Sequence, residues 1–497
     1  MNQLSRPCAV LCVLACAVTL EAREKWHEVH SPNFVVISNA AEGRTKDVAA
    51  RMEQFRYALS RLLPSLNFAT EVPTQVYAFR DFDSFESFLP RTNDGVTPPA
   101  GYFREGPYKN VIALDLSAGR AAYERVVFHE YVHLLLSLGF RDYPLWFEEG
   151  MAEFYSSTRL HDDSAELGVV EEHHRRVLAT RPLLPLAELL TAADDWPLSA
   201  SAHDSALFYA QSWGLVHYLV AGSGTEGHRK LASYLGRLSR DEDRLEAFHA
   251  AFEMSPEAME DALTAYVEAG DFPHYEFSLS EMDWKDGFET KVLTMAEVQH
   301  RWGELFLFTG RAREAEVCLE EACRLNPNMA AAWKTRGIAA LMNGRHEEAL
   351  AYLKRAVSGD GVSPTGLYLY ARALLRNHSG QWVESVPDEL AEEAERALTR
   401  SLELKPAQSE TARLLAFVYL VRGVRLEEAT ELVEGALTMT PGRPSLLYLY
   451  GQILARRGDY QSAREALGQM RADATEPSLQ KARDELLARL DTAERAR

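Results

Sequence analysis

Hydrophobic positions follow two different periods in the first part of the chain. Apolar runs at residues 34–39, 73–79 and 110–116 predict strands. Residues 45–63 and 121–137 carry apolar side chains at helical spacing, which predicts two helices. Strands and helices mix in the sequence up to the second of these helices, and helical patterns dominate after it. We therefore expect an α+β domain.

From about residue 290 onward the pattern changes to a repeat with a period of 34 residues. One set of residues recurs 34 positions later; the first set is Gly310, Ala315, Leu319 and Ala322, and the second is Gly344, Ala349, Leu353 and Ala356. Unrelated amphipathic helices are the alternative. A unit of this length, with small residues where two helices cross, resembles the tetratricopeptide repeat. The resemblance implies an all-α solenoid of about five units, with an insertion in the third unit at residues 378–388.

These patterns divide the chain of 497 residues into two domains. We expect the α+β domain at residues 23–275 and the repeats at residues 290–480, joined by a linker at residues 276–289. A chain of this length is sufficient for both. Repeat arrays present concave surfaces to peptides and helices, so we expect a protein partner on the repeats.

The longest apolar run of the chain lies at its start, in residues 8–20. Arg6 precedes it and small residues lie near its end, which is typical of an export signal over residues 1–22. The run is too short for a comfortable membrane span. A lipid anchor at Cys16 is the alternative, although Leu14 is unfavourable for that motif. We expect an exported protein, either periplasmic or secreted.

Composition and charge narrow the possible functions. Apolar residues make up 46% and charged residues 25% of the chain, as in soluble globular proteins. The formal net charge of −20 repels phosphate backbones, which argues against nucleic acid as a partner. After removal of the signal only Cys318 and Cys323 remain, and their spacing on a predicted helix is unsuited to a disulfide. The domains must therefore be stabilised by their cores.

The sequence HEYVH, residues 129–133, lies in the second predicted helix. His129 and His133 are four apart, so both imidazoles project from one face of the helix. That separation suits two ligands of one tetrahedral Zn²⁺. Glu130 lies beside them and can reach a water on the metal without being a ligand. Two structural histidines satisfied by hydrogen bonds are the alternative, but buried imidazoles beside a carboxylate are costly unless they are paired or bind metal.

A catalytic zinc has three protein ligands and one open position, so a third ligand is needed. The acidic candidates downstream are Asp142, Glu148, Glu149 and Glu153. Pro144 fits the first turn of a further helix. On that helix Glu149 and Glu153 share one face, whereas Glu148 is rotated away by about 100°. An acidic pair at this spacing supplies a ligand and a partner that orients a ligating histidine.

Residues 144–155, PLWFEEGMAEFY, taken together with HEYVH, resemble the gluzincin metallopeptidases, in which a glutamate ligand on the next helix follows HExxH. The segment is similar to WLNEGFA of the alanyl-aminopeptidase group, and more similar to the peptidase-MA-like bacterial proteins. The resemblance covers about residues 24–270. It implies a zincin-like fold with Glu149 as the third ligand, and the spacing of the acidic pair then makes Glu153 the orienting partner. The chain departs from the family at Glu148, where many relatives have Asn, and in its spacer of fifteen residues, which requires a tighter turn.

Residues 207–220, LFYAQSWGLVHYLV, hold a further candidate. Gluzincins use a Tyr or His from a later helix to stabilise the oxyanion, and the resemblance places Tyr209 at the comparable position. A phenol hydrogen bond suits this role, although an aromatic residue in an apolar helix is commonly part of the core. His173 and His174 lie among charged residues, so we expect them on a solvated face. His217 is left open between the core and the site.

The resemblance implies a zinc-dependent peptidase that acts on peptide or protein substrates. The implied metal ligands are His129, His133 and Glu149. Glu130 would act as the base and Tyr209 would stabilise the oxyanion. An endopeptidase is favoured because no GxMEN-like segment precedes HEYVH, and substrate is expected to add as a strand beside residues 110–116. The alternative is an inactive exported scaffold, in which the repeats act and the peptidase domain is a relic.

Overall fold

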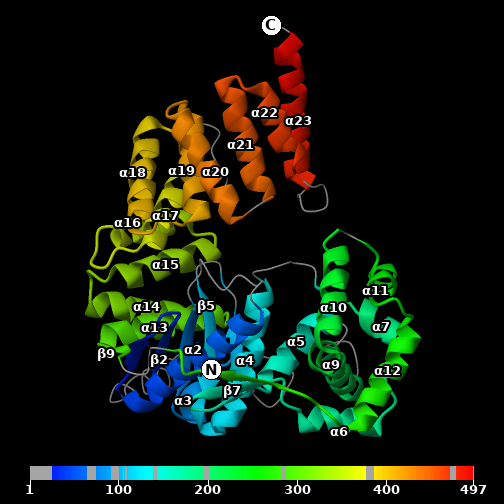
Figure 1. Cartoon of the computed structure of the whole chain (residues 1–497). Coiled ribbons are helices and arrows are strands. Elements are labelled where there is room, and N and C mark those ends of the chain that lie inside the picture. The colour runs from blue at the N-terminus through cyan, green and yellow to red at the C-terminus, as the bar shows by residue number, and fades with distance from the viewer. Residues whose placement is uncertain are drawn as a thin grey trace, which may run out of the picture. The chain divides into compact units, whose positions relative to one another are not determined.

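The structure is a computed structural model of the chain (Figure 1). It describes residues 25–63, 74–90, 100–104, 106, 109–137, 143–193, 202–240, 242–282, 287–376, 386–440, 442–470 and 477–495. The chain divides into two compact units, unit 1 at Met1–Leu293 and unit 2 at Thr294–Arg497. The predicted export signal, with Cys16, and residues 378–385 of the predicted insertion lie outside the described residues. Among the described helices, none has both the length and the apolar character needed to cross a membrane.

The larger sheet of unit 1 has six strands within the described residues, in the order β4-β5-β3-β2-β1-β9. The strands are β1 (His27–His30), β2 (Phe34–Ser38), β3 (Thr74–Phe79), β4 (Gly101–Arg104), β5 (Asn110–Asp115) and β9 (Glu289–Val292). β2, β3 and β5 run parallel, and β1, β4 and β9 pair antiparallel with their neighbours. The three parallel strands are the three that the sequence predicts, and the mixture of helices and strands confirms an α+β arrangement for unit 1.

Two helices that the sequence predicts, α2 (Glu42–Leu62) and α4 (Arg120–Ser137), share one core with the inward side chains of the parallel strands. Phe55 of α2 stacks on Phe128 of α4 with ring centroids 3.9 Å apart. The buried side chains of Arg51 and Glu124 form an ion pair between the same helices, with an N–O distance of 2.6 Å. These contacts fix the position of α4, the helix that carries HEYVH.

The second half of unit 1 is mainly helical. A small sheet in the order β6-β7-β8 consists of β6 (Arg159–Leu160), β7 (Ser164–Leu167) and β8 (Tyr275–Ser278). The helices are α3 (Phe82–Glu86) in the first half, and then α5 (Leu145–Ser156), α6 (Glu172–Thr180), α7 (Leu186–Thr191), α9 (Ala202–His217), α10 (Gly224–Leu238), α11 (Arg244–Phe252) and α12 (Pro256–Ala269). α5 packs against both α4 and α9, which brings three elements to the candidate site.

The structure corrects the predicted linker at residues 276–289. Most of β8 lies in this segment and pairs with β7, and β9 begins at its end and pairs with β1. Both strands belong to unit 1, so the boundary lies between Leu293 and Thr294. Each strand has only four residues, with no fully buried position, and pairs with a partner far away in the sequence. The local hydrophobic pattern therefore does not reveal them.

The prediction that residues 110–116 form an exposed edge strand is also wrong. β5, which these residues form, has a neighbour on each side, β3 and β4. The strand at that end of the sheet is β4, within the described part of the chain. β4 was missed because it is only four residues long, GYFR, and follows a loop rich in Pro and Gly.

Unit 2 consists of successive helices in its described residues (Figure 1). They are α13 (Met295–Phe308), α14 (Ala312–Leu325), α15 (Ala330–Met342), α16 (His346–Ala356), α17 (Pro364–Leu374), α18 (Asp388–Leu404), α19 (Ser409–Arg422), α20 (Leu426–Met439), α21 (Pro444–Arg457), α22 (Tyr460–Gly468) and α23 (Pro477–Arg495). The first ten helices form five antiparallel pairs, and the two helices of each pair are consecutive in the sequence and pack together. This number agrees with the expected five repeat units. Cys318 and Cys323 are both buried in α14 and form no disulfide.

In the first two helix pairs the crossing of the helices depends on a glycine. A Cβ atom added to Gly303 would lie 2.6 Å from Cγ of Leu319, and one added to Gly337 would lie 2.6 Å from Cγ of Leu353. Because such distances are too short for a real contact, only glycine permits this approach. The same contact recurs after 34 residues, so the predicted period is confirmed as a repeated helix pair.

Unit 2 should fold without unit 1. A fragment of residues 294–497 keeps the capping box at the start of α13, in which Thr294 and Glu297 bond each other's backbone. Each helix pair is stabilised mainly by its neighbours, so we expect a helical circular dichroism spectrum and a cooperative thermal melt. A fragment that lacks helix, or melts without a cooperative transition, would show that the two units share one core.

Candidate metal centre

The two histidines of HEYVH lie on α4 at the border between its buried and its accessible side. Phe128 and Val132 are buried, whereas His129 and His133 are partly exposed. The spacing of one turn brings the two imidazole rings to a centroid separation of 4.8 Å. Their Nε2 atoms are 3.1 Å apart. α4 therefore presents two imidazole nitrogens to one point.

Glu149 of α5 supplies a third donor atom at the same point. Its Oε2 lies 3.6 Å from Nε2 of His129 and 3.6 Å from Nε2 of His133. Ligand atoms at zinc-bond distances around a tetrahedral ion are about 3.4 Å apart, so the three separations fit a zinc ion. Two imidazoles and one carboxylate are also a donor set that catalytic zinc uses. In the described part of the chain, no other group of His, Cys, Asp and Glu converges in this way.

The register of α5 decides which acidic residue reaches the histidines. α5 begins after Pro144, whose φ of −61° suits the start of a helix. Glu149 and Glu153, one turn apart, approach opposite nitrogens of the His129 ring, at 3.6 Å from Nε2 and 3.5 Å from Nδ1. Glu148 is not one of the three converging residues. Asp142, another candidate from the sequence, lies outside the described residues.

Gly150 brings α9 close to α5. A Cβ atom at this position would lie 2.5 Å from the carbonyl oxygen of Ser212 and 2.6 Å from Cγ2 of Val216, both on α9. The two helix backbones can approach so closely only because residue 150 has no side chain. The glycine that follows Glu149 thus determines how near the site α9 lies.

Tyr209 lies on α9 and is partly exposed. Burial and the negative charges of Glu149, Glu153 and Glu130 raise the pKa of its phenol to about 12. α9 packs against α5, so Tyr209 lies on a helix that neighbours the one with Glu149 and Glu153. At neutral pH the phenol keeps its proton and can donate a hydrogen bond.

Glu130 stands apart from the three donors and has a raised pKa. Burial is the main cause of the raised pKa, and the charge of Glu149 adds to it. Positive charge on His129, His133 and Arg104 opposes the shift. A raised pKa brings a carboxyl group closer to the range in which a general base works at neutral pH. The pKa of His133 is also raised: burial lowers it, but the hydrogen bond and charge of Glu149 outweigh burial.

Glu153 lies behind His129 and contacts a residue that the sequence did not indicate. Its Oε2 is 2.9 Å from Nε2 of His174 on α6 and 3.3 Å from Nη2 of Arg125 on α4. Burial raises the pKa of Glu153, but the hydrogen bond of His174 and the charges of His129, His174 and Arg125 outweigh burial and lower this pKa to about 2. Glu153 is therefore ionised.

The prediction that His174 lies on a solvated face is wrong, although His173 beside it is exposed. His174 is 4% exposed and shares the buried face of α6 with Val177 and Leu178. The signal was present in the sequence, because positions 174, 177 and 178 have the spacing of one helical face. The four charged residues around His173 and His174 led to the prediction of a solvated face.

His217, which the sequence left open, belongs to the core. It is fully buried and lies 2.9 Å from the hydroxyl of Tyr266 through Nδ1 and 2.9 Å from the carbonyl oxygen of Gly168 through Nε2. The carbonyl can only accept, so Nε2 carries the hydrogen and the Tyr266 hydroxyl donates to Nδ1. Burial lowers the pKa of His217 to about 4. A neutral, fully bonded imidazole has a structural role here.

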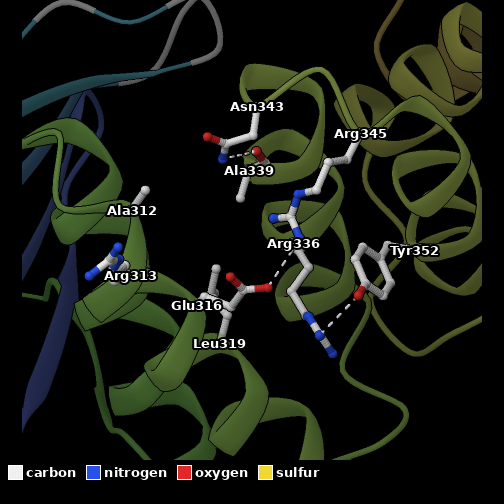
Figure 2. A pocket seen from close by; sticks show the side chains of 9 residues that line it. All are labelled: Ala312, Arg313, Glu316, Leu319, Arg336, Ala339, Asn343, Arg345 and Tyr352. Atoms are coloured by element: carbon white, nitrogen blue, oxygen red, sulfur yellow. Dashed lines mark hydrogen bonds and ion pairs between the residues drawn. The ribbon is translucent and has the colours of Figure 1, made fainter. Parts of the chain in front are cut away.

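Unit 2 has a pocket of about 470 Å³ between α14, α15 and α16 (Figure 2). Its polar lining residues are Arg313, Glu316, Arg336, Asn343, Arg345 and Tyr352. Arg345 pairs with Glu316 at 3.3 Å, and Arg336 pairs with Glu320 at 3.3 Å. Two of its three arginines are thus paired with carboxylates, and we assign no ligand to the pocket.

Comparison with known families covers parts of both units. A family model described as "Protein of unknown function (DUF1570)" matches residues 125–243, a range that includes every residue of the candidate centre. Models of the tetratricopeptide repeat match residues 300–365 and 425–490. Together with the repeated helix pairs, these matches identify unit 2 as a tetratricopeptide-repeat solenoid. No curated protein matches the sequence.

Solved repeat structures resemble part of the chain. YrrB, described as a TPR protein with an unusual peptide-binding site, is 18% identical over 38% of this chain and 92% of its own, with a TM-score of 0.33. MamA from Desulfovibrio magneticus RS-1 is 19% identical over 36% and 94%, with a TM-score of 0.30. Pseudomonas aeruginosa pilF is 19% identical over 39% and 88%, with a TM-score of 0.30.

Replacement of Gly150 should destabilise the protein because a methyl group has no space between α5 and α9. Gly150→Ala should lower the free energy of unfolding by about 1–3 kcal/mol, as overpacking does. Gly236→Ala on α10 is the matched control, since a Cβ there meets nothing within 4 Å. The control should be neutral or slightly stabilising, because alanine favours helix. Denaturant unfolding of both variants tests this, and equal stabilities would contradict the packing argument.

Proposed function

We propose that the protein is a zinc-dependent peptidase, with endopeptidase activity favoured, in which unit 1 hydrolyses peptide bonds and unit 2 binds protein. The convergence of His129, His133 and Glu149 at separations that suit zinc carries the proposal. Glu130, beside them but outside the donor set, supports it. The resemblance of HEYVH and residues 144–155 to the gluzincins favours the same function. A zincin-like fold for unit 1 is part of the proposal.

Glu130 is the proton carrier in this proposal. Zinc, when bound, would polarise the scissile carbonyl and lower the pKa of the attacking water. Glu130 takes a proton from that water and passes it to the leaving amine. Burial raises the pKa of Glu130, which makes its carboxylate a stronger base, and this supports the first of the two steps.

Tyr209 would stabilise the negative charge that develops on the attacked carbonyl oxygen. Its phenol, with a pKa of about 12, is protonated over the working range of such an enzyme. A preorganised donor aimed at a developing oxyanion is among the strongest contributions to catalysis. α9 holds Tyr209 near the site through the close contact at Gly150.

β4 is the strand on which a substrate would lie in this proposal. β4 is an edge strand of the larger sheet among the described residues, and α4 packs against it. An extended peptide can add to such an edge through backbone hydrogen bonds, which are independent of peptide sequence and length. Recognition of this kind favours cleavage within a chain. The edge is β4 and not residues 110–116, which are paired on both sides.

A binding scaffold is the second candidate function. The tetratricopeptide repeats that match residues 300–365 and 425–490 favour it, because such arrays bind proteins. Unit 1 would then be inactive. Zinc binding without cleavage of any member of a mixed peptide pool, or of denatured proteins, would favour the scaffold. We also propose that the protein is exported, on the basis of the apolar run at residues 8–20.

Glu130→Gln should separate metal binding from catalysis. The amide cannot act as a base, so hydrolysis of a fluorogenic peptide should fall by a factor of about 10² to 10⁴. Zinc content after dialysis should stay near one equivalent, because Glu130 is not one of the converging donors. An unchanged rate of hydrolysis would rule out Glu130 as the base.

Glu149→Ala should remove most of the zinc, because only two donors remain at the site. Glu148→Ala is the matched control, one position away on the same helix, and should retain both zinc and activity. Metal analysis and the peptide assay on the two variants give the comparison. Loss of zinc from Glu148→Ala with retention in Glu149→Ala would mean that Glu148 is the ligand.

A further inference from the structure

Glu153 is held by two donors on the side away from the metal centre. The hydrogen bond from His174 is 2.9 Å long, and Arg125 lies 3.3 Å from the same oxygen, Oε2. The side chains of Glu153 and His174 are 13% and 5% exposed. An ionised carboxylate at such burial requires partners, and these two donors supply them.

Both donors are themselves fixed by the start of α6. The second guanidinium nitrogen of Arg125 pairs at 2.9 Å with Glu171, the residue that caps α6. Nδ1 of His174 is buried and has no hydrogen-bond partner among the described residues. The hydrogen of a neutral His174 is therefore on Nε2, from which it donates to Glu153.

The arrangement leaves one oxygen of Glu153 for His129. Oε2 is occupied by His174 and Arg125, and Oε1 lies 3.5 Å from Nδ1 of His129. A carboxylate at this place favours the tautomer of His129 with hydrogen on Nδ1. The lone pair of Nε2 then points to the place where the other two donors converge.

We propose that His174 is a positioning residue of the metal centre. It holds Glu153, and through Glu153 it fixes the orientation and tautomer of His129. Arg125 contributes less, because its side chain is 38% exposed and its contact is longer. The inference rests on the proposed function in so far as it concerns affinity for zinc, but the state of His129 can be measured without metal.

Zinc affinity of the full-length protein, measured by competition with a chelator, gives the first test. His174→Leu should weaken zinc binding by about 10- to 100-fold, the range typical for partners of ligating histidines. His174→Gln, whose amide can still donate, should recover much of the affinity. His173→Leu, the same change at the exposed neighbour, should leave it unchanged. If a folded His174→Leu variant binds zinc within twofold of the wild-type affinity, the proposal is overturned. If this variant does not fold, His174→Asn replaces it, because the Asn side chain is polar but too short to reach Glu153.

A double-mutant cycle separates positioning from a general structural role. In a Glu153→Gln background the carboxylate is already gone, so His174→Leu should weaken zinc binding by no further factor. If His174 acted only by stabilising the fold, the same factor would appear in both backgrounds. That second result would overturn the proposal.

The metal-free protein gives a test that does not depend on zinc. With ¹⁵N-labelled histidines, the wild type should show His129 with its hydrogen on Nδ1, and His174→Leu should show a mixture of tautomers. The same mixture in both proteins would contradict the inference. A wild type that binds no zinc would overturn the proposed function, while the tautomer of His129 would still decide the role of His174.

Discussion

Three atoms with lone pairs converge at the candidate centre, and holding them together is the constraint on which the arrangement of unit 1 depends. Nε2 of His129, Nε2 of His133 and Oε2 of Glu149 are separated by 3.1, 3.6 and 3.6 Å. Without a cation, a hydrogen between the two Nε2 atoms, or between His133 and Glu149, relieves only part of the repulsion among these atoms, so packing must hold them together. The ring stack and the buried ion pair between α2 and α4 hold α4, which carries the two histidines. The close approach of α9 at Gly150 holds α5, which carries Glu149. A cation at the point of convergence would attract all three atoms, which supports the proposed metal site.

The surroundings give the acidic groups of the two helices different properties. Burial raises the pKa of Glu130, whereas burial of Glu153 is outweighed by His174, His129 and Arg125, and its pKa falls to about 2. The pKa of one carboxyl group is thus raised by its surroundings, and the pKa of the other is lowered. Environments that push the pKa values of neighbouring carboxyl groups apart are a recurring way to assign separate roles in catalysis. The separation here follows from which partner each group has, because both are largely withdrawn from water.

The parts of the site that depend on helical periodicity were predictable from the sequence. The spacing of His129 and His133, and the shared face of Glu149 and Glu153, follow from 3.6 residues per turn, and the structure brings these residues together. The contact of His174 with Glu153 joins separate helices, so no local pattern contains it. The same reason explains the strands β4, β8 and β9, which are short and are defined by distant partners. The 34-residue repeat was visible because small and apolar residues, among them Leu319 and Leu353, recur at that interval in the sequence itself.

The two units therefore depend on different kinds of contact. The candidate centre uses groups between Arg125 and Tyr209, on α4, α5, α6 and α9, all within unit 1. Its properties depend on burial and on the charged partners of each carboxyl group, which together set the pKa of that group. Unit 2 uses a contact of glycine against leucine in three of its helix pairs, at Gly303, Gly337 and Gly451. In the proposed function the chemistry therefore belongs to unit 1, and unit 2 would bind a protein partner through surfaces that several repeats form together.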